Sequence, residues 1–128
     1  MDFDNIAIGT DIEEIERFAN KTIEHDEKFL RKIFTSSEIE YCFKDKQSAS
    51  HLCVRYCAKE AVVKALSQFK ISNVYYSDIE ILNNENGLPY CNIKKYPNIK
   101  VKVSLSHSKT YATATVLCFN GWNPVLIF

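Results

Sequence analysis

Apolar residues are spaced differently in the two halves of the chain. Before residue 70 they recur mostly at intervals of three and four, which is typical of helices with one buried face. The helices predicted from this spacing cover residues 12–18, 26–34, 35–43 and about 50–66. A short strand over residues 5–9 precedes them, and Thr35 with Glu38 has the spacing of a helix-capping box.

After residue 78 apolar and polar residues alternate, which predicts strands. These strands cover residues 78–82, 89–93, 100–106 and 111–119. The first two flank the turn-forming sequence NNENG and should form a hairpin, and Asn-Gly at 120–121 predicts another hairpin into the last residues. Helices followed by consecutive strands indicate an α+β fold, with a mainly antiparallel sheet packed against helices.

Length and charge narrow the possible functions. The 128 residues indicate a single domain, residues 1–128. The 16 basic and 16 acidic side chains cancel, which argues against a bulk attraction to nucleic acid or membrane. No apolar run approaches the roughly 20 residues that span a bilayer, and the first residues do not resemble a signal peptide. We therefore expect a cytoplasmic protein that binds neither nucleic acid nor membrane.

The five cysteines have irregular spacings, which predict neither a disulfide framework nor a structural zinc site. His51, Cys53 and Cys57 could be three metal ligands at the start of the long helix. Ordinary packing in the core is the better interpretation, because the sequence suggests no fourth ligand.

The long predicted helix contains the sequence VRYCAKEAVVKAL at residues 54–66 and is apolar over most of its surface. Arg55 and Lys59 share one edge of it, and Glu60 and Lys64 share the other. The simplest interpretation of Glu60 and Lys64 is an ion pair across one helical turn. The alternative is that they line a polar cleft, where a carboxylate and an ammonium could hold a metal ion and an anionic substrate.

Two further segments contain candidate functional residues. Asp11 lies where the first predicted strand gives way to a helix, so it could cap that helix with Glu14, or it could supply a carboxylate to Mg²⁺. His107 lies between Ser106 and Ser108 at a strand end, where the three donors would suit a phosphate. A plain turn residue is the simpler interpretation of His107. No acidic partner supports a Ser-His nucleophile.

Taken together and in this order, the segments resemble the holo-[acyl-carrier-protein] synthase family, the short type of 4'-phosphopantetheinyl transferase. The resemblance extends from Ile8 to about Cys118. It rests on the sequences IGTDIEEIERF, FTSSEIEYC, RYCAKEAVVKAL, NGLPY and SLSHSKTYATA. The Lys-Glu-Ala helix with its downstream lysine is the most specific of these.

The resemblance implies an activity. Members of this family transfer the phosphopantetheine arm of coenzyme A to a serine of an apo acyl carrier protein and release adenosine 3',5'-bisphosphate. Asp11 and Glu60 match the positions that bind Mg²⁺, and Lys64 would neutralise charge on the coenzyme A diphosphate. Glu60 is also the candidate to accept the serine proton, directly or through water.

The resemblance also implies how the substrates bind. Ser106, His107 and Ser108 would contact the 3'-phosphate of the nucleotide, with Arg55 as a further donor, and the turn containing Gly87 and Pro89 would border the adenosine. The basic residues expected to meet the acidic carrier protein are Arg17, Lys28 and Lys32, although Lys28 and Lys32 could equally be solvated helix charges. Members are commonly homotrimers that share the coenzyme A cleft between subunits.

The chain departs from the family pattern in two places. Ser67, Gln68 and Phe69 replace a glycine-containing turn after the long helix, and Leu88 replaces a lysine that often precedes the hairpin proline. Glycine lets backbone amides approach a phosphate, so coenzyme A affinity or a subunit contact could be altered. These departures leave open a dedicated carrier protein in place of the fatty-acid one, a non-catalytic module that binds coenzyme A or a carrier protein, and an accidental motif match.

Overall fold

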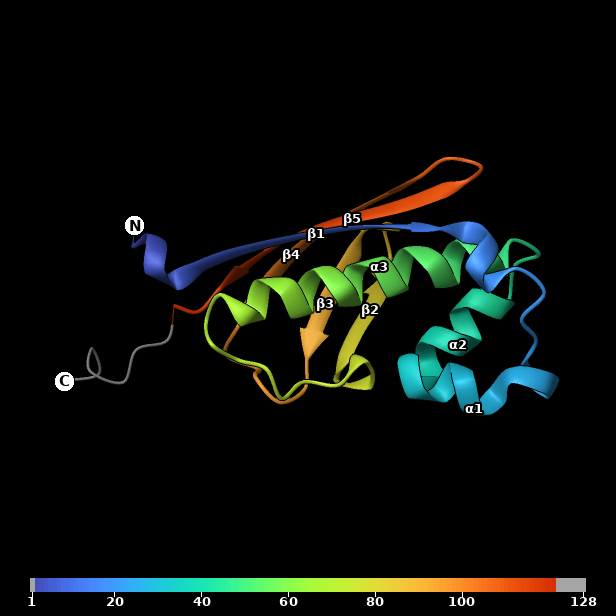
Figure 1. The fold of residues 1–128 in the computed structure, drawn as a ribbon, viewed down its shortest axis with the longest axis horizontal. Coiled ribbons are helices and arrows are strands. Elements are labelled where there is room, and N and C mark those ends of the chain that lie inside the picture. The colour runs from blue at the N-terminus through green and yellow to red at the C-terminus, as the bar shows by residue number, and fades with distance from the viewer. Residues whose placement is uncertain (1, 122–128) are drawn as a thin grey trace.

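The computed structural model describes residues 2–121, and within them three α-helices and five strands form an α+β fold (Figure 1). The helices are α1 (Ile23–Ile33), α2 (Ser36–Phe43) and α3 (Ser48–Ser67). The strands are β1 (Ile6–Glu14), β2 (Ile79–Asn83), β3 (Pro89–Ile93), β4 (Lys100–His107) and β5 (Tyr111–Phe119). Short 3-10 helices cover Phe3–Asn5, Ile15–Phe18 and Tyr76–Asp78. The predicted fold class is confirmed.

The strands form two antiparallel sheets. One has the order β1-β5-β4 and the other is the hairpin of β2 and β3. Helix α3 packs along the first sheet, while α1 and α2 gather at one end (Figure 1). The predicted hairpin around NNENG is confirmed, with Ile81 opposite Cys91 and Gly87 at φ 80° in its turn. The hairpin predicted at 120–121 runs into residues 122–128, which lie outside the described part of the chain.

The helix predicted over residues 12–18 is wrong. Strand β1 continues to Glu14, paired with Tyr111 of β5, and residues 15–18 form a 3-10 helix. Ile12, the first residue of that predicted helix, points away from α3: it lies with Ile8 on the outer face of the sheet, and the two are 61% and 58% exposed. Pairing with β5 gives the segment an extended backbone, so Asp11 lies within a strand and is not a helix cap.

The other predicted helices form with slightly different ends. Helix α1 begins three residues earlier than expected, after Thr22, whose hydroxyl accepts a hydrogen bond from the amide of His25. The capping box of Thr35 and Glu38 is confirmed at the start of α2. None of the described helices is long and apolar enough to cross a membrane.

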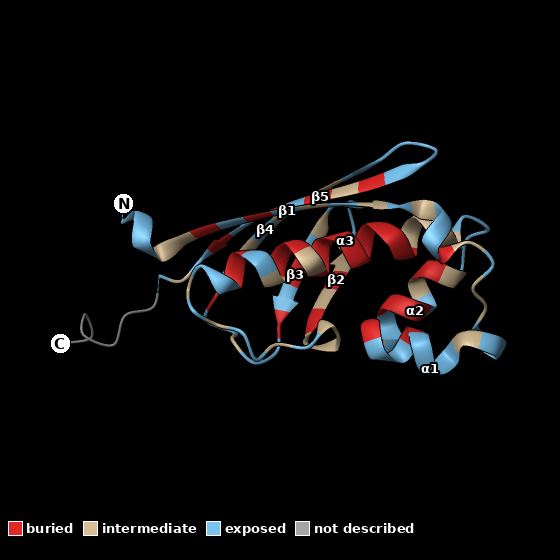
Figure 2. Cartoon of the chain, viewed as in Figure 1, coloured by how far each residue is buried: buried red, intermediate tan, exposed pale blue. Residues whose placement is uncertain are grey.

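The core lies around α3, which is buried along most of its length (Figure 2). Leu52, Ala58, Ala61 and Val62 are fully buried against the inner sheet face. Two charged residues, Arg55 and Lys59, are buried on the same helix. Lys59 forms a 2.7 Å ion pair with Glu38, and both side chains are completely enclosed. Burial of a charge requires such partners, so these residues connect α3 to α2 and the hairpin.

Candidate active site

Strand β1 presents an acidic stripe to helix α3. Successive residues of a strand point to opposite faces, so Gly9, Asp11 and Glu13 face α3 while Ile8 and Ile12 face outward. Gly9 has no room for a side chain, because a Cβ there would overlap the carbonyl of Ala61. This close approach brings the carboxylates that follow Gly9 up to the edge of α3.

Asp11 is joined to α3 by Lys64. The Lys64 ammonium lies 3.2 Å from Asp11 Oδ1 and donates to the carbonyl of Thr10 at 2.9 Å. The Asp11 side chain is 10% exposed, whereas that of Lys64 is 55% exposed and open to solvent. The second carboxylate oxygen, Asp11 Oδ2, is buried and has no hydrogen-bond partner among the described residues. A buried carboxylate oxygen left without a donor is suited to a cation.

Glu60 lies one helical turn before Lys64, but no ion pair joins the two within the described chain. Its Oε1 instead accepts hydrogen bonds from the hydroxyls of Tyr56, at 3.0 Å, and Tyr76. Burial raises the pKa of both phenols, and the bond to Glu60 raises the pKa of each further. Both tyrosines therefore remain protonated donors at neutral pH. The simple ion-pair interpretation of Glu60 and Lys64 is wrong for this structure.

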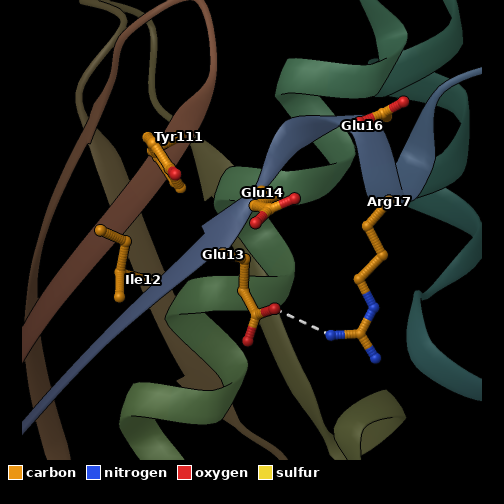
Figure 3. A pocket seen from close by; sticks show the side chains of 6 residues that line it. All are labelled: Ile12, Glu13, Glu14, Glu16, Arg17 and Tyr111. Atoms are coloured by element: carbon orange, nitrogen blue, oxygen red, sulfur yellow. Dashed lines mark hydrogen bonds and ion pairs between the residues drawn. The ribbon is translucent and has the colours of Figure 1, made fainter.

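Glu13 and Arg17 complete the polar cluster. Arg17 donates to Glu13 at 2.8 Å, and its guanidinium lies 4.8 Å from the centre of the Tyr56 ring. Figure 3 shows the two side chains turned toward each other beside the hollow at the end of β1. Burial raises the pKa of Glu13 and the nearby Asp11 carboxylate adds to this, while Arg17 opposes it. Sequence analysis missed Glu13 because a helix was predicted there; strand alternation would have placed it beside Asp11.

Asp11 and Glu60 are the carboxylates that could hold a Mg²⁺ ion, and their role as its ligands stays a prediction. The described residues contain no group of three or more His, Cys, Asp or Glu side chains that could hold a metal. Magnesium needs fewer protein ligands, because it keeps waters and takes substrate phosphate oxygens. The buried, unpartnered oxygen of Asp11 and the acidic residues around it match that preference.

The candidate phosphate donors near the end of β4 do not all point toward the same place. His107 borders a hollow with Gln47 and Ser50 at the start of α3, away from Lys64. Ser106 pairs with Thr113 on the outer sheet face, opposite to the face of His107. The Ser108 hydroxyl accepts from the amides of the β4–β5 turn. Within one chain, Lys64 therefore does not contribute to the hollow that His107 borders.

Arg55 is held inside the fold. Its guanidinium donates to the carbonyls of Ile81 and His51 and to the side chain of Asn83, and the residue is 2% exposed. In this structure the guanidinium therefore has a structural role. Its role as a phosphate donor stays a prediction. Arg55 anchors the hairpin whose turn contains Gly87 and Pro89, since Asn83 also donates to the Gly87 carbonyl.

The basic residues near the N-terminus differ in environment. Lys28 and Lys32 are exposed on α1, and neither forms an ion pair among the described residues. Phe29 lies between them in sequence and is 39% exposed. Arg17 is engaged with Glu13, as described above. Within residues 2–121, helix α1 thus offers two lysines without an ion pair beside an exposed aromatic ring.

The residues after α3 show what replaces the expected glycine turn. The Gln68 side chain accepts from the amide of Ile8 at 3.1 Å and donates to its carbonyl at 2.8 Å. Phe69 packs against the core. Lys64 and Gln68, which lie one helical turn apart at the end of α3, thus bond to backbone groups of two alternate β1 residues. Lys64 bonds to Thr10 and Gln68 bonds to Ile8. The substitution provides a side-chain anchor for the strand that contains Asp11.

Known proteins resemble this chain over most of its length. A family model described as the 4'-phosphopantetheinyl transferase superfamily matches residues 7–116. The holo-[acyl-carrier-protein] synthase of Protochlamydia amoebophila is 41% identical over 114 residues, covering 85% of this chain and 93% of the relative. That of Thermodesulfovibrio yellowstonii is 40% identical over 111 residues, covering 87% and 96%.

Solved structures show the same similarity. The holo-(acyl-carrier-protein) synthase of Bacillus anthracis, in complex with CoA (3',5'-ADP), superposes with a TM-score of 0.74 at 30% identity, covering 90% of this chain and 96% of the other. The Helicobacter pylori holo-[acyl-carrier-protein] synthase, in complex with coenzyme A, gives 0.71 at 32% identity, covering 85% and 96%.

Proposed function

Because this chain belongs to the holo-[acyl-carrier-protein] synthase family of the 4'-phosphopantetheinyl transferase superfamily, we propose that it modifies an acyl carrier protein. It is a 4'-phosphopantetheinyl transferase. The reaction moves the phosphopantetheine arm of coenzyme A onto a serine hydroxyl of the apo carrier protein. The observation that supports this best is the buried, unpartnered Oδ2 of Asp11, beside the exposed ammonium of Lys64.

The bonds broken and formed define what the site must do. The serine oxygen attacks the phosphorus next to pantetheine, and the bond from this phosphorus to the oxygen that bridges the diphosphate breaks. The bridging oxygen leaves as part of adenosine 3',5'-bisphosphate, and the serine hydroxyl gives up its proton to a base. Negative charge grows on the bridging and nonbridging oxygens during this step. An active site for this reaction needs fixed positive charge near the diphosphate and a group that accepts the serine proton.

Asp11 and Glu60 would hold Mg²⁺, which neutralises the diphosphate when bound. Lys64 is the side chain placed to share this charge, since its ammonium is tethered to Asp11 and Thr10 yet exposed. Its two protein bonds fix its position, so little reorganisation is needed during the reaction. Glu60, directly or through water, accepts the proton that leaves the serine.

Substrate binding would use more distant parts of the molecule. We propose that His107, with the neighbouring hydroxyls of Ser106 and Ser108, contacts the 3'-phosphate of the nucleotide, while the turn of Gly87 and Pro89 borders the adenosine. Lys28 and Lys32, exposed on α1, together with Arg17, would receive the acidic carrier protein. Exposed charges of this kind mainly set the rate of association and its salt dependence.

The outer face of the β1-β5-β4 sheet supports self-association. Ile8, Ile12, Tyr111 and Leu117 are 58%, 61%, 46% and 43% exposed on it. Apolar side chains exposed on one sheet face can form a protein interface, and Ile8 and Leu117 are paired directly across this one. We propose a homotrimer in which His107 of one subunit and Asp11 of another serve the same coenzyme A molecule. This arrangement would bring together two residues that do not share a hollow within one chain, since Asp11 does not line the hollow that His107 borders.

Intact-mass analysis of an apo acyl carrier protein tests the activity. The carrier is incubated with this chain, coenzyme A and Mg²⁺, and the expected result is one added phosphopantetheine. Glu60→Gln and Asp11→Asn should each abolish Mg²⁺-dependent transfer and leave the fold intact, as judged by circular dichroism. Coenzyme A binding without transfer to any carrier in a panel would instead identify a binding module.

Native mass spectrometry tests the assembly independently. The wild-type chain should appear as a trimer, and Leu117→Lys on the outer sheet face should shift it toward the monomer. A wild-type chain that stays monomeric at micromolar concentration would overturn the shared-site arrangement.

A further inference from the structure

Glu60 is held by two phenols that approach it from different parts of the chain. Tyr56 lies one turn earlier on α3, and Tyr76 belongs to the 3-10 helix of residues 76–78 that leads into β2. Both hydroxyls donate to the same oxygen, Glu60 Oε1. Among the described residues, no hydrogen bond reaches the other carboxylate oxygen, Oε2. The two oxygens of Glu60 therefore have different environments.

The donors are themselves fixed. The Tyr56 residue is 7% exposed, and its ring lies 5.6 Å from that of Phe18 and 4.8 Å from the guanidinium of Arg17. The Tyr56 and Tyr76 rings lie 5.7 Å apart, tilted by 57°. The backbone carbonyl of Tyr76 also accepts from the buried ammonium of Lys59. Ring packing therefore holds Tyr56, and the hydrogen bond from Lys59 holds the backbone from which the Tyr76 side chain extends.

From this geometry we propose that Tyr56 and Tyr76 are positioning residues that hold Glu60 by Oε1 and present Oε2 to the metal. The inference rests on the proposed function, because it names how one of the two proposed Mg²⁺ ligands is oriented. A carboxylate on a side chain with several rotatable bonds loses entropy when it binds an ion. Hydrogen bonds from neighbouring groups set that orientation beforehand, as they do for ligands in many metal sites.

A purely structural role for the phenols makes a different prediction. If the tyrosines only fill space, their rings matter and their hydroxyls do not. Tyr76→Phe and Tyr56→Phe keep the rings and remove one donor each. Tyr96→Phe is the matched control, because its hydroxyl donates to Asn73 Oδ1 at 3.0 Å, in a part of the molecule that shares no contact with Glu60.

The test measures metal affinity directly and separately from turnover. Mn²⁺ replaces Mg²⁺, and free Mn²⁺ is followed by electron paramagnetic resonance during titration of the protein with coenzyme A present. We expect each of Tyr56→Phe and Tyr76→Phe to weaken Mn²⁺ binding, and the double variant to weaken it about 10- to 100-fold, the usual range for residues that orient a metal ligand. Tyr96→Phe should bind Mn²⁺ as the wild type does.

Transfer kinetics provide the second readout. The Mg²⁺ concentration for half-maximal rate should rise in parallel with the Mn²⁺ dissociation constant, while KM for coenzyme A at saturating Mg²⁺ stays unchanged. Wild-type transfer with unchanged Mn²⁺ affinity in all the tyrosine variants would overturn the positioning role and leave the proposed function intact. A wild-type chain that neither binds Mn²⁺ nor transfers the arm would overturn both.

Discussion

The ammonium of Lys64 lies 3.2 Å from the carboxylate of Asp11, although the two residues are 53 positions apart in the sequence. One comes from α3 and the other from the centre of β1, so their separation depends on how closely the helix packs on the strand. The pair leaves the ammonium exposed and one Asp11 oxygen buried without a partner. This relationship explains several measurable properties of the chain.

Lys64→Met should impair transfer far more than stability. Loss of a fixed positive charge next to the reacting diphosphate should lower kcat/KM about 100- to 1,000-fold, as for other groups that stabilise transition-state charge. The free energy of unfolding should change by only about 1 kcal/mol, because the Lys64 side chain is 55% exposed and water can take its place beside Asp11. Steady-state kinetics and urea unfolding measure the two effects. Lys94→Ala, which removes another exposed lysine, is the control and should change neither; an equal loss of activity in it would contradict the assignment.

Gly9→Ala should damage the contact between β1 and α3. A Cβ at residue 9 would overlap the carbonyl of Ala61 and lie 3.2 Å from the amide of Ala65, and neither backbone group can yield easily. We expect a loss of about 3 kcal/mol or more in the free energy of unfolding, at the upper end for overpacking. Ser104→Ala, at an exposed position of β4, should cost less than ~0.5 kcal/mol. Equal midpoints of urea unfolding for Gly9→Ala and the wild type would show that the helix can move.

Lys59→Met should be strongly destabilising because it leaves the Glu38 carboxylate buried without its cation. Both side chains are completely enclosed at 2.7 Å, and burial lowers the pKa of Lys59 while Glu38 opposes that shift. Removing one partner of a buried pair costs about 3–5 kcal/mol. Glu38→Gln removes the unpaired charge but keeps an acceptor for only one of the amides of Thr35 and Ile81, so adding it to Lys59→Met should recover only part of the loss. A double-mutant cycle by urea denaturation measures this coupling; additive losses would contradict it.

Loss of the proton from Glu13 should lower the free energy of unfolding as pH rises. Its pKa is raised in the folded chain by burial first and by the Asp11 carboxylate. A carboxyl whose folded pKa lies above its unfolded value adds stability below about pH 4.5, and this is lost as pH rises through the folded pKa. The free energy of unfolding of Glu13→Gln minus that of the wild type should therefore increase as pH rises from 4 to 7. Urea unfolding with EDTA present measures the difference; a gap independent of pH would exclude this origin.

The local elements of this protein follow from short-range chemistry. The capping box at Thr35, the apolar period of α3 and the turn at Gly87 are each determined within a few residues, and each is found as expected. The family could be identified because its motifs are equally local, as in the Lys59-Glu60-Ala61 segment. Assignment of Asp11, Glu60 and Lys64 to one site came from that resemblance, because their spacing does not place them together.

Only the tertiary structure decided how the site is built. Pairing with β5 made residues 6–14 one strand, so Asp11 and Glu13 share a face that a helix would have separated. Burial surrounded Arg55 with protein partners, and packing of the 3-10 helix of residues 76–78 beside α3 added the Tyr76 hydroxyl to that of Tyr56 as a donor to Glu60. The sequence by itself determined the elements after residue 22, because helix periods, caps and turns act over a few residues. Partners of a charged side chain depend on which distant segments pack beside it, and that depends on the whole fold.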